Sequence, residues 1–192
     1  MEIQGAIGPH ATRLIIPDLA LAVDKGRVFA VASQVGVTSQ AGLSLTTPVL
    51  TLYNPLGSGV KGRLWYAGAV FTVAFASAGA VWLAAGTSPV AAEVTGTLTT
   101  AHRNLNMGGV SAQGNKIVPF LAATLPAAPV AIALLGVGLT GAITAAMFLQ
   151  NLGRWFNKSI AIRPGTNLSI QTGVASGASG MFNEYIWEEE DE

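Results

Sequence analysis

The sequence predicts an all-β protein whose body is an antiparallel β-sandwich. Several segments alternate large or β-branched residues with small or polar ones at a period of two, which is typical of strands. Gly, Pro and Asn separate these segments, and no alternation of strands with helices points to a parallel sheet. Because 192 residues suit one substantial core, we expect one sandwich domain over residues 27–188. An extended N-terminal arm at 1–26 precedes it, and a short acidic C-terminal tail at 189–192 follows.

The composition is poor in charge. Charged residues make up 10% of the chain, against about 25% in an average soluble protein, so something other than water is expected to cover much of the surface. The formal net charge is zero, which argues against nucleic acid and anionic membranes as partners. Cysteine is absent, which excludes disulfides, thiolate metal sites and cysteine nucleophiles. The first residues lack the order of a secretory signal.

Two long uncharged segments raise the question of a membrane. Residues 64–92 and 117–152 contain no charged side chain, and a membrane-spanning helix needs about 20 apolar residues. The first segment begins with alternating aromatic and small residues, which favours a strand. In the second, Pro119, Pro126 and Pro129 would interrupt a helix. We therefore expect buried strands, and an integral membrane protein is the alternative.

The first half of the chain is expected to be an arm followed by strands. Residues 1–19 carry Gly and Pro without sustained periodicity, which indicates an extended lead-in. Aromatic, β-branched and alternating residues then predict strands at 27–33, 43–53, 62–76 and 80–85. Alternation in the third of these strands places its large side chains on one face: Trp65, Phe71, Val73 and Phe75.

The middle of the chain, residues 86–129, is rich in Thr, Gly, Asn and Pro. It contains one short strand-like pattern at 95–100 and a Gly/Asn loop at 104–115. Residues 130–137 are apolar enough for another buried strand, and the Ala, Met, Phe, Leu and Gln of 142–149 are compatible with a helix.

The C-terminal third shows the clearest pattern. Residues 158–163 and 168–174 alternate on either side of a turn at 164–167, which predicts a β-hairpin. Residues 181–188 form the closing strand. One of its faces carries Phe182, Glu184, Ile186 and Glu188, and the other carries Met181, Asn183, Tyr185 and Trp187. Seven or eight strands separated by turns indicate a sandwich, and we favour the jelly-roll form.

Four pieces of the sequence also resemble jelly-roll virion proteins of tailed bacteriophages. They are NPLGSG at 54–59, LPAAP at 125–129, IRPG at 162–165 and EYIWEE at 184–189. The resemblance spans residues 27–189. It implies a homotrimeric decoration or cement protein on the capsid exterior of the virion that binds the major capsid protein, or a tail or fibre component. The arm and the acidic end are not part of it.

The sequence offers little material for catalysis. The two histidines, His10 and His102, lie in unrelated segments, so we expect surface or interface roles for both. Asp18, Asp24 and Glu93 are the acids between Ile3 and Asn183, and no motif spacing joins them. We therefore expect no enzyme activity, no cofactor and no metal.

The large aromatic residues and the acidic end are the candidate interface. Aromatic side chains bury large areas and dominate interface energetics. The five C-terminal acids form either a solvated tail or a docking segment for a basic patch. The candidate residues are Trp65, Phe71, Trp82, Trp155, Trp187, Glu188, Glu189 and Glu190.

Two functions are open for such a protein. The first is a capsid decoration or cement protein that stabilises the shell by burying area across neighbouring capsid subunits. The second is a receptor- or glycan-binding module at a tail or fibre, which would need an exposed aromatic and polar cluster.

Overall fold

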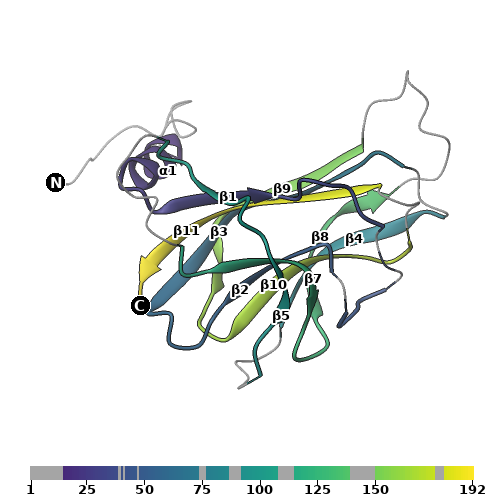
Figure 1. The fold of residues 1–192 in the computed structure, drawn as a ribbon. Helices are drawn as coiled ribbons and strands as arrows, with labels where there is room; N and C mark the ends of the chain where they lie inside the picture. The colour runs from purple at the N-terminus through teal and green to yellow at the C-terminus, as the bar shows by residue number, and fades with distance from the viewer. Residues whose placement is uncertain are drawn as a thin grey trace.

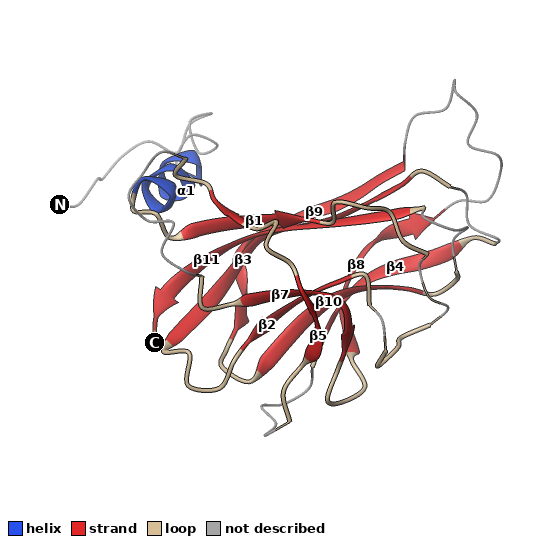
Figure 2. Cartoon of the chain, viewed as in Figure 1, coloured by secondary structure: helices blue, strands red, loops and turns tan. Residues whose placement is uncertain are grey.

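The computed structural model describes residues 15–38, 40, 42–46, 48–73, 77–86, 92–107, 115–138, 150–175 and 180–192. Within these ranges the chain forms one helix and eleven strands, arranged as two antiparallel sheets that face each other (Figures 1 and 2). The predicted all-β sandwich is therefore confirmed. The helix considered at 142–149 lies outside the described residues, as do arm residues 1–14.

The two sheets have different widths. Sheet A has the strand order β6-β1-β11-β3-β9 and sheet B has the order β5-β7-β2-β10-β4-β8. The strands of sheet A are β1 (Val28–Ala32), β3 (Val60–Phe71), β6 (Arg103–Asn104), β9 (Gln150–Ile162) and β11 (Met181–Asp191). Those of sheet B are β2 (Leu50–Asn54), β4 (Gly79–Ala85), β5 (Thr95–Leu98), β7 (Val118–Thr124), β8 (Val130–Gly138) and β10 (Thr166–Thr172).

The strands pair in a nested order. β1 pairs with β11, β2 with β10, β3 with β9 and β4 with β8, and every one of these pairs is antiparallel. The first four strands alternate between the sheets, and so do the last three. The chain therefore resembles one long hairpin rolled up, with β5, β6 and β7 inserted between β4 and β8 to widen both sheets.

The predicted hairpin across residues 158–174 is wrong. β9 lies in sheet A and β10 in sheet B, so the turn between them carries the chain from one sheet to the other. The turn itself is tight, since Gly165 has a φ of 79° and the Thr166 N–H donates to the Arg163 carbonyl at 3.0 Å. The sequence of each strand alternates, although β10 is buried on both faces, and alternation does not reveal which strand is the partner.

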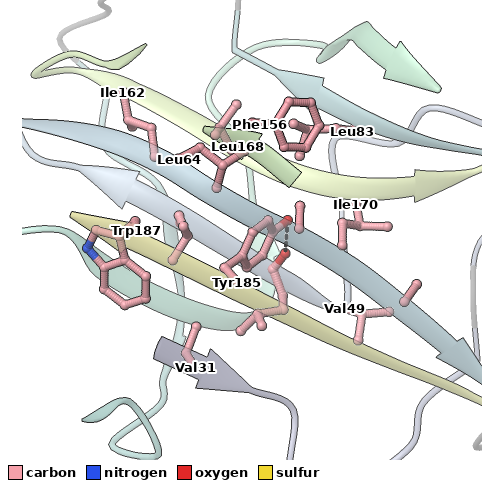
Figure 3. Packing of buried hydrophobic residues seen from close by; sticks show 14 of the residues in the cluster. Val31, Val49, Leu64, Leu83, Phe156, Ile162, Leu168, Ile170, Tyr185 and Trp187 are labelled. Carbon is pink, nitrogen blue, oxygen red and sulfur yellow. Dashed lines mark hydrogen bonds between the residues drawn. The ribbon is translucent and has the colours of Figure 1, made fainter. Parts of the chain in front are cut away.

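The inner faces of the two sheets form the main core (Figure 3). The predicted faces of β11 are confirmed, because Met181, Tyr185 and Trp187 point inward and are at most 1% exposed. The Tyr185 hydroxyl donates to the Leu50 carbonyl at 3.3 Å and so links the sheets, and the Trp187 ring stacks on Phe29. Around them pack Leu64, Leu83, Phe156, Ile162, Leu168 and Ile170.

A β-bulge at Trp65 changes the faces of β3. Opposite β11, Ile186 pairs with Tyr66 and Trp187 pairs with Leu64, so Trp65 is the extra residue. Phe71 faces the core, whereas Trp65 packs on the opposite face of the sheet. The expectation that Trp65 and Phe71 share a face is therefore wrong, because strict alternation fails at an inserted residue.

Helix α1 (Ile15–Asp24) occupies part of the predicted extended arm, which is corrected accordingly. Pro17 lies in its first turn, where the missing N–H has no helical partner to lose. The helix ends in a Schellman motif: Gly26 has a φ of 67°, its N–H donates to Val23, and the Arg27 N–H donates to Ala22. Figure 1 shows α1 on the side of sheet A that faces away from sheet B.

The predicted acidic tail is also corrected. β11 continues to Asp191, and its last residues pair with the first residues of β3, where Glu189 lies opposite Gly62 and Glu190 opposite Lys61. The acids from Glu188 to Asp191 are thus part of a strand that pairs with β3.

Candidate functional site

A cluster of charged side chains lies between α1 and the outer face of sheet A. At its centre, the Glu188 side chain is 0% exposed. Its Oε1 is 2.7 Å from Arg27 Nη2, and its Oε2 is 2.9 Å from Lys158 Nζ. The Trp65 indole N–H donates to the same Oε2 at 3.3 Å. A buried carboxylate with two cations and an N–H donor is well compensated for its loss of water.

Lys158 reaches this cluster because β9 bulges. Asn157 and Lys158 have φ values of 48° and 66°, in the left-handed region that non-glycine residues rarely adopt. The ammonium lies 3.1 Å from Asp18 Oδ2 on α1 and 5.1 Å from the centre of the Trp65 ring. One side chain on β9 therefore ties the helix to two strands of sheet A.

The chemistry of Lys158 is that of a fixed cation. Burial alone would lower its pKa, but hydrogen bonds to Glu188 and Asp18 and the charges of these two carboxylates outweigh burial and raise the pKa above its usual 10.5. A lysine that acts as a nucleophile needs a lowered pKa so that it loses its proton near neutral pH. This cluster therefore attaches α1 to the sheet and does not supply a reactive amine.

Glu189 and Glu190 also bind partners within the chain. Glu189 accepts hydrogen bonds from the N–H groups of Lys116 and Ile117 at 2.9 and 3.0 Å and from the Trp187 indole at 3.2 Å. Burial raises the pKa of Glu189, although these hydrogen bonds oppose the shift. Glu190 lies 3.3 Å from Arg63 Nε and 3.6 Å from Lys61 Nζ. The sequence offered no signal for these partners, which come from distant segments.

The aromatic residues predicted at an interface differ in how far their side chains are buried. Trp65, Phe71 and Trp187 are at most 2% exposed, and Trp82 is partly buried on β4. Trp155 is 52% exposed on β9. The structure thus does not bring the eight candidate residues together in one place.

The last strand of sheet B carries an exposed apolar surface that we call the β8 edge. It consists of Val130, Ile132, Leu134 and Val137, which are between 46% and 51% exposed. β8 approaches β9 beside this edge, since a Cβ on Gly136 would meet the Leu152 side chain at 2.8 Å. The sequence predicted a buried strand at 130–137; the strand is present, but the expectation of burial is wrong, because most of its side chains are exposed or only partly buried.

Other polar features have ordinary explanations. An open groove of about 490 Å³ is lined by Arg27 and Lys116 against Glu189 and Asp191, so its charges balance. His102 Nδ1 lies 3.1 Å from the Thr99 carbonyl in a connecting loop. Across the described ranges, no three His, Asp or Glu side chains gather as a metal site, and His10 lies outside those ranges.

Comparisons of the chain with models of protein families, with curated protein sequences and with solved structures gave no match. Among the helices of the described residues, none has the length and apolar character to cross a membrane.

Proposed function

We propose that the chain is a non-enzymatic structural protein that binds other protein subunits, with the β8 edge as its principal contact. The observation that carries this proposal is that an uncharged outer strand leaves four aliphatic side chains about half exposed. Natural edge strands are usually protected by charged residues, and a group of exposed apolar side chains on one element is a candidate interaction site.

The edge strand of sheet A, β9, is protected in the way that β8 is not. β9 carries Arg154 and Lys158 and a bulge with two left-handed residues, devices that discourage association. β8 also has register irregularities against β4, near Ile132 and Leu135, but no charge. Packing of its side chains is therefore a better basis for contact than continuous backbone pairing with a partner strand.

The finer fold in this proposal is a jelly roll. Support comes from the nested pairing, in which β1, β11, β3 and β9 share one sheet and β2, β10, β4 and β8 share the other. Double-sheet jelly rolls of eight strands occur in viral capsid proteins. Because one fold can serve many functions, this likeness is a weaker argument than the exposed edge.

The particle role follows from the sequence resemblance to phage virion proteins. In this proposal the chain forms a homotrimer on the capsid exterior and stabilises the shell by binding across neighbouring major capsid subunits. A specific interface of this kind buries about 1,600 Å², so the β8 edge would be one part of a larger contact.

The first experiment measures self-association. Sedimentation equilibrium of the wild-type chain should give a multiple of the 19.6 kDa chain mass, with a trimer expected. Replacement of Ile132 and Leu134 by Lys should produce a monomer of unchanged melting temperature, because both side chains are exposed. Leu56→Lys is the matched control, since Leu56 is 49% exposed in a turn and should leave the mass unchanged.

The second experiment adds the chain to empty, expanded capsids of the phage that encodes it. Saturation at a fixed ratio and a higher melting temperature of the shell are expected for the wild type, with weaker binding by the double Lys variant. A chain that is monomeric at all concentrations and does not bind the shell would refute the proposal.

A further inference from the structure

The outer face of sheet A carries an aromatic corner beside the part that α1 covers. Tyr66 on β3 lies opposite Trp155 on β9, with ring centres 5.1 Å apart and planes inclined by 54°. Gly68 and Gly153 form the next pair on the same face of these strands, and a Cβ on either glycine would collide with the Tyr66 ring. The glycines therefore let Tyr66 lie flat on the sheet, while Trp155 stands largely exposed beside it.

A carboxylate completes this corner. Glu184 on β11 lies opposite Gly68, so it points from the same face in the row next to the aromatic pair. Burial, together with the negative charge of nearby Glu184, raises the pKa of Tyr66. Within the described residues, no cation forms an ion pair with Glu184, in contrast to Glu188 and Glu190.

We propose that Trp155, Tyr66 and Glu184 form a binding site for an arginine side chain of a partner protein. Two inclined aromatic faces attract a cation through their ring quadrupoles, and an unpaired carboxylate beside them supplies the opposite charge. A guanidinium laid over Tyr66 would have one edge directed at Glu184 and its face or other edge against Trp155.

Arginine fits this corner better than the alternatives. Its planar group stacks on aromatic rings, is weakly hydrated and binds a carboxylate with two parallel N–H donors. Lysine offers a compact and strongly hydrated charge that does not use a flat surface in this way. A sugar could also stack on Trp155, but it would not require the charge of Glu184. The inference goes beyond the proposed function, since it holds whether or not the β8 edge binds another copy of the chain.

The test is an NMR titration of the full chain with Nα-acetyl-arginine amide, following the Trp155 indole N–H, which Trp155→Phe assigns. We expect saturable shifts with a dissociation constant in the millimolar range, typical of a single side chain. The neutral isostere Nα-acetyl-citrulline amide should bind at least about tenfold more weakly. Nα-acetyl-lysine amide should also bind more weakly.

Variants then separate charge from stacking. Glu184→Gln keeps the shape and should weaken arginine binding at least about fivefold, and Trp155→Ala should abolish it without changing the melting temperature. Glu93→Gln, which alters an exposed acid ahead of β5, should change nothing. Equal binding of citrulline or lysine, no effect of Glu184→Gln, or shifts with methyl glucosides but not with arginine would each overturn the inference.

Discussion

At the scale of the residue, the ammonium of Lys158 is the group that most affects how the helix is held. It contacts carboxylates from α1 and β11 and the ring of Trp65 from β3. In Lys158→Met the stem can still pack on Trp65, but Glu188 keeps only Arg27 and the indole N–H as partners. Because Glu188 is fully buried, we expect a loss of about 2 kcal/mol in the free energy of unfolding.

Urea denaturation measures this loss, and Lys61→Met is the control. Lys61 pairs with Glu190 at 3.6 Å near the surface, so its removal should cost less than about 1 kcal/mol. The two variants losing the same stability would contradict the role assigned to Lys158.

The same lysine predicts a dependence on pH. Its pKa is raised above 10.5 in the folded chain, so its contribution is fully present below the ordinary lysine pKa and is lost as the pH rises through the raised value. The stability difference between wild type and Lys158→Met should therefore be constant from pH 7 to about 10 and shrink above it. Denaturation at a series of pH values tests this, and a difference that grows above pH 10 would contradict it.

Sequence alone could not anticipate this cluster. The side-chain faces of β11 followed from alternation and were predicted correctly. The position of Lys158 depends on left-handed residues within a strand, and that of Trp65 on a bulge, neither of which a period of two can reveal. Glu188 was predicted in the closing strand, and the run of acids from it was interpreted as a solvated tail or a docking segment; the cations that pair with Glu188 and Glu190 lie far away in the sequence.

At the scale of the element, α1 is attached by one apolar face as well as by charge. Ala22 is 1% exposed and packs with Trp65 and Val28, whereas Ala20 on the same helix is exposed. Ala22→Arg should lower the free energy of unfolding by about 2 kcal/mol, since a large charged side chain has no room there. Ala20→Arg should change it by less than about 0.5 kcal/mol.

Tryptophan fluorescence gives a second measurement for this pair of variants. If Ala22→Arg releases the helix, Trp65 becomes hydrated and the emission maximum moves to longer wavelength, while Ala20→Arg leaves it in place. Indistinguishable stability and emission in the two variants would show that α1 does not pack on the sheet as described.

Strand positions and strand partners differ in how far the sequence reveals them. Segments 27–33, 80–85 and 130–137 were predicted close to their observed bounds because β-branched and aromatic residues cluster there. The one pairing that was predicted, the hairpin across residues 158–174, is wrong, since the turn at Gly165 suits a hairpin and a crossing between sheets equally well. The Thr-rich middle had too little hydrophobic patterning to indicate that β5, β6 and β7 extend both sheets.

At the scale of the whole molecule, the nested pairing makes the last strand essential to the first. β11 lies between β1 and β3 in sheet A and supplies Tyr185 and Trp187 to the core. A chain that ends at Gly180 leaves β1 without this partner and the core open, so we expect it to lack a cooperative unfolding transition. Deletion of Glu192 alone, an exposed residue, is the control and should leave the transition nearly unchanged.

The same topology should set the folding rate. β1 pairs with β11, which lies more than 140 residues further along the chain. Proteins dominated by such distant pairings fold in about milliseconds to seconds. Stopped-flow refolding of the full chain should fall at the slow end of this range, and the truncated chain should show no folding phase. A truncated chain that refolds cooperatively would mean that sheet A closes without its central strand, and the nested arrangement would then not be what holds the sandwich together.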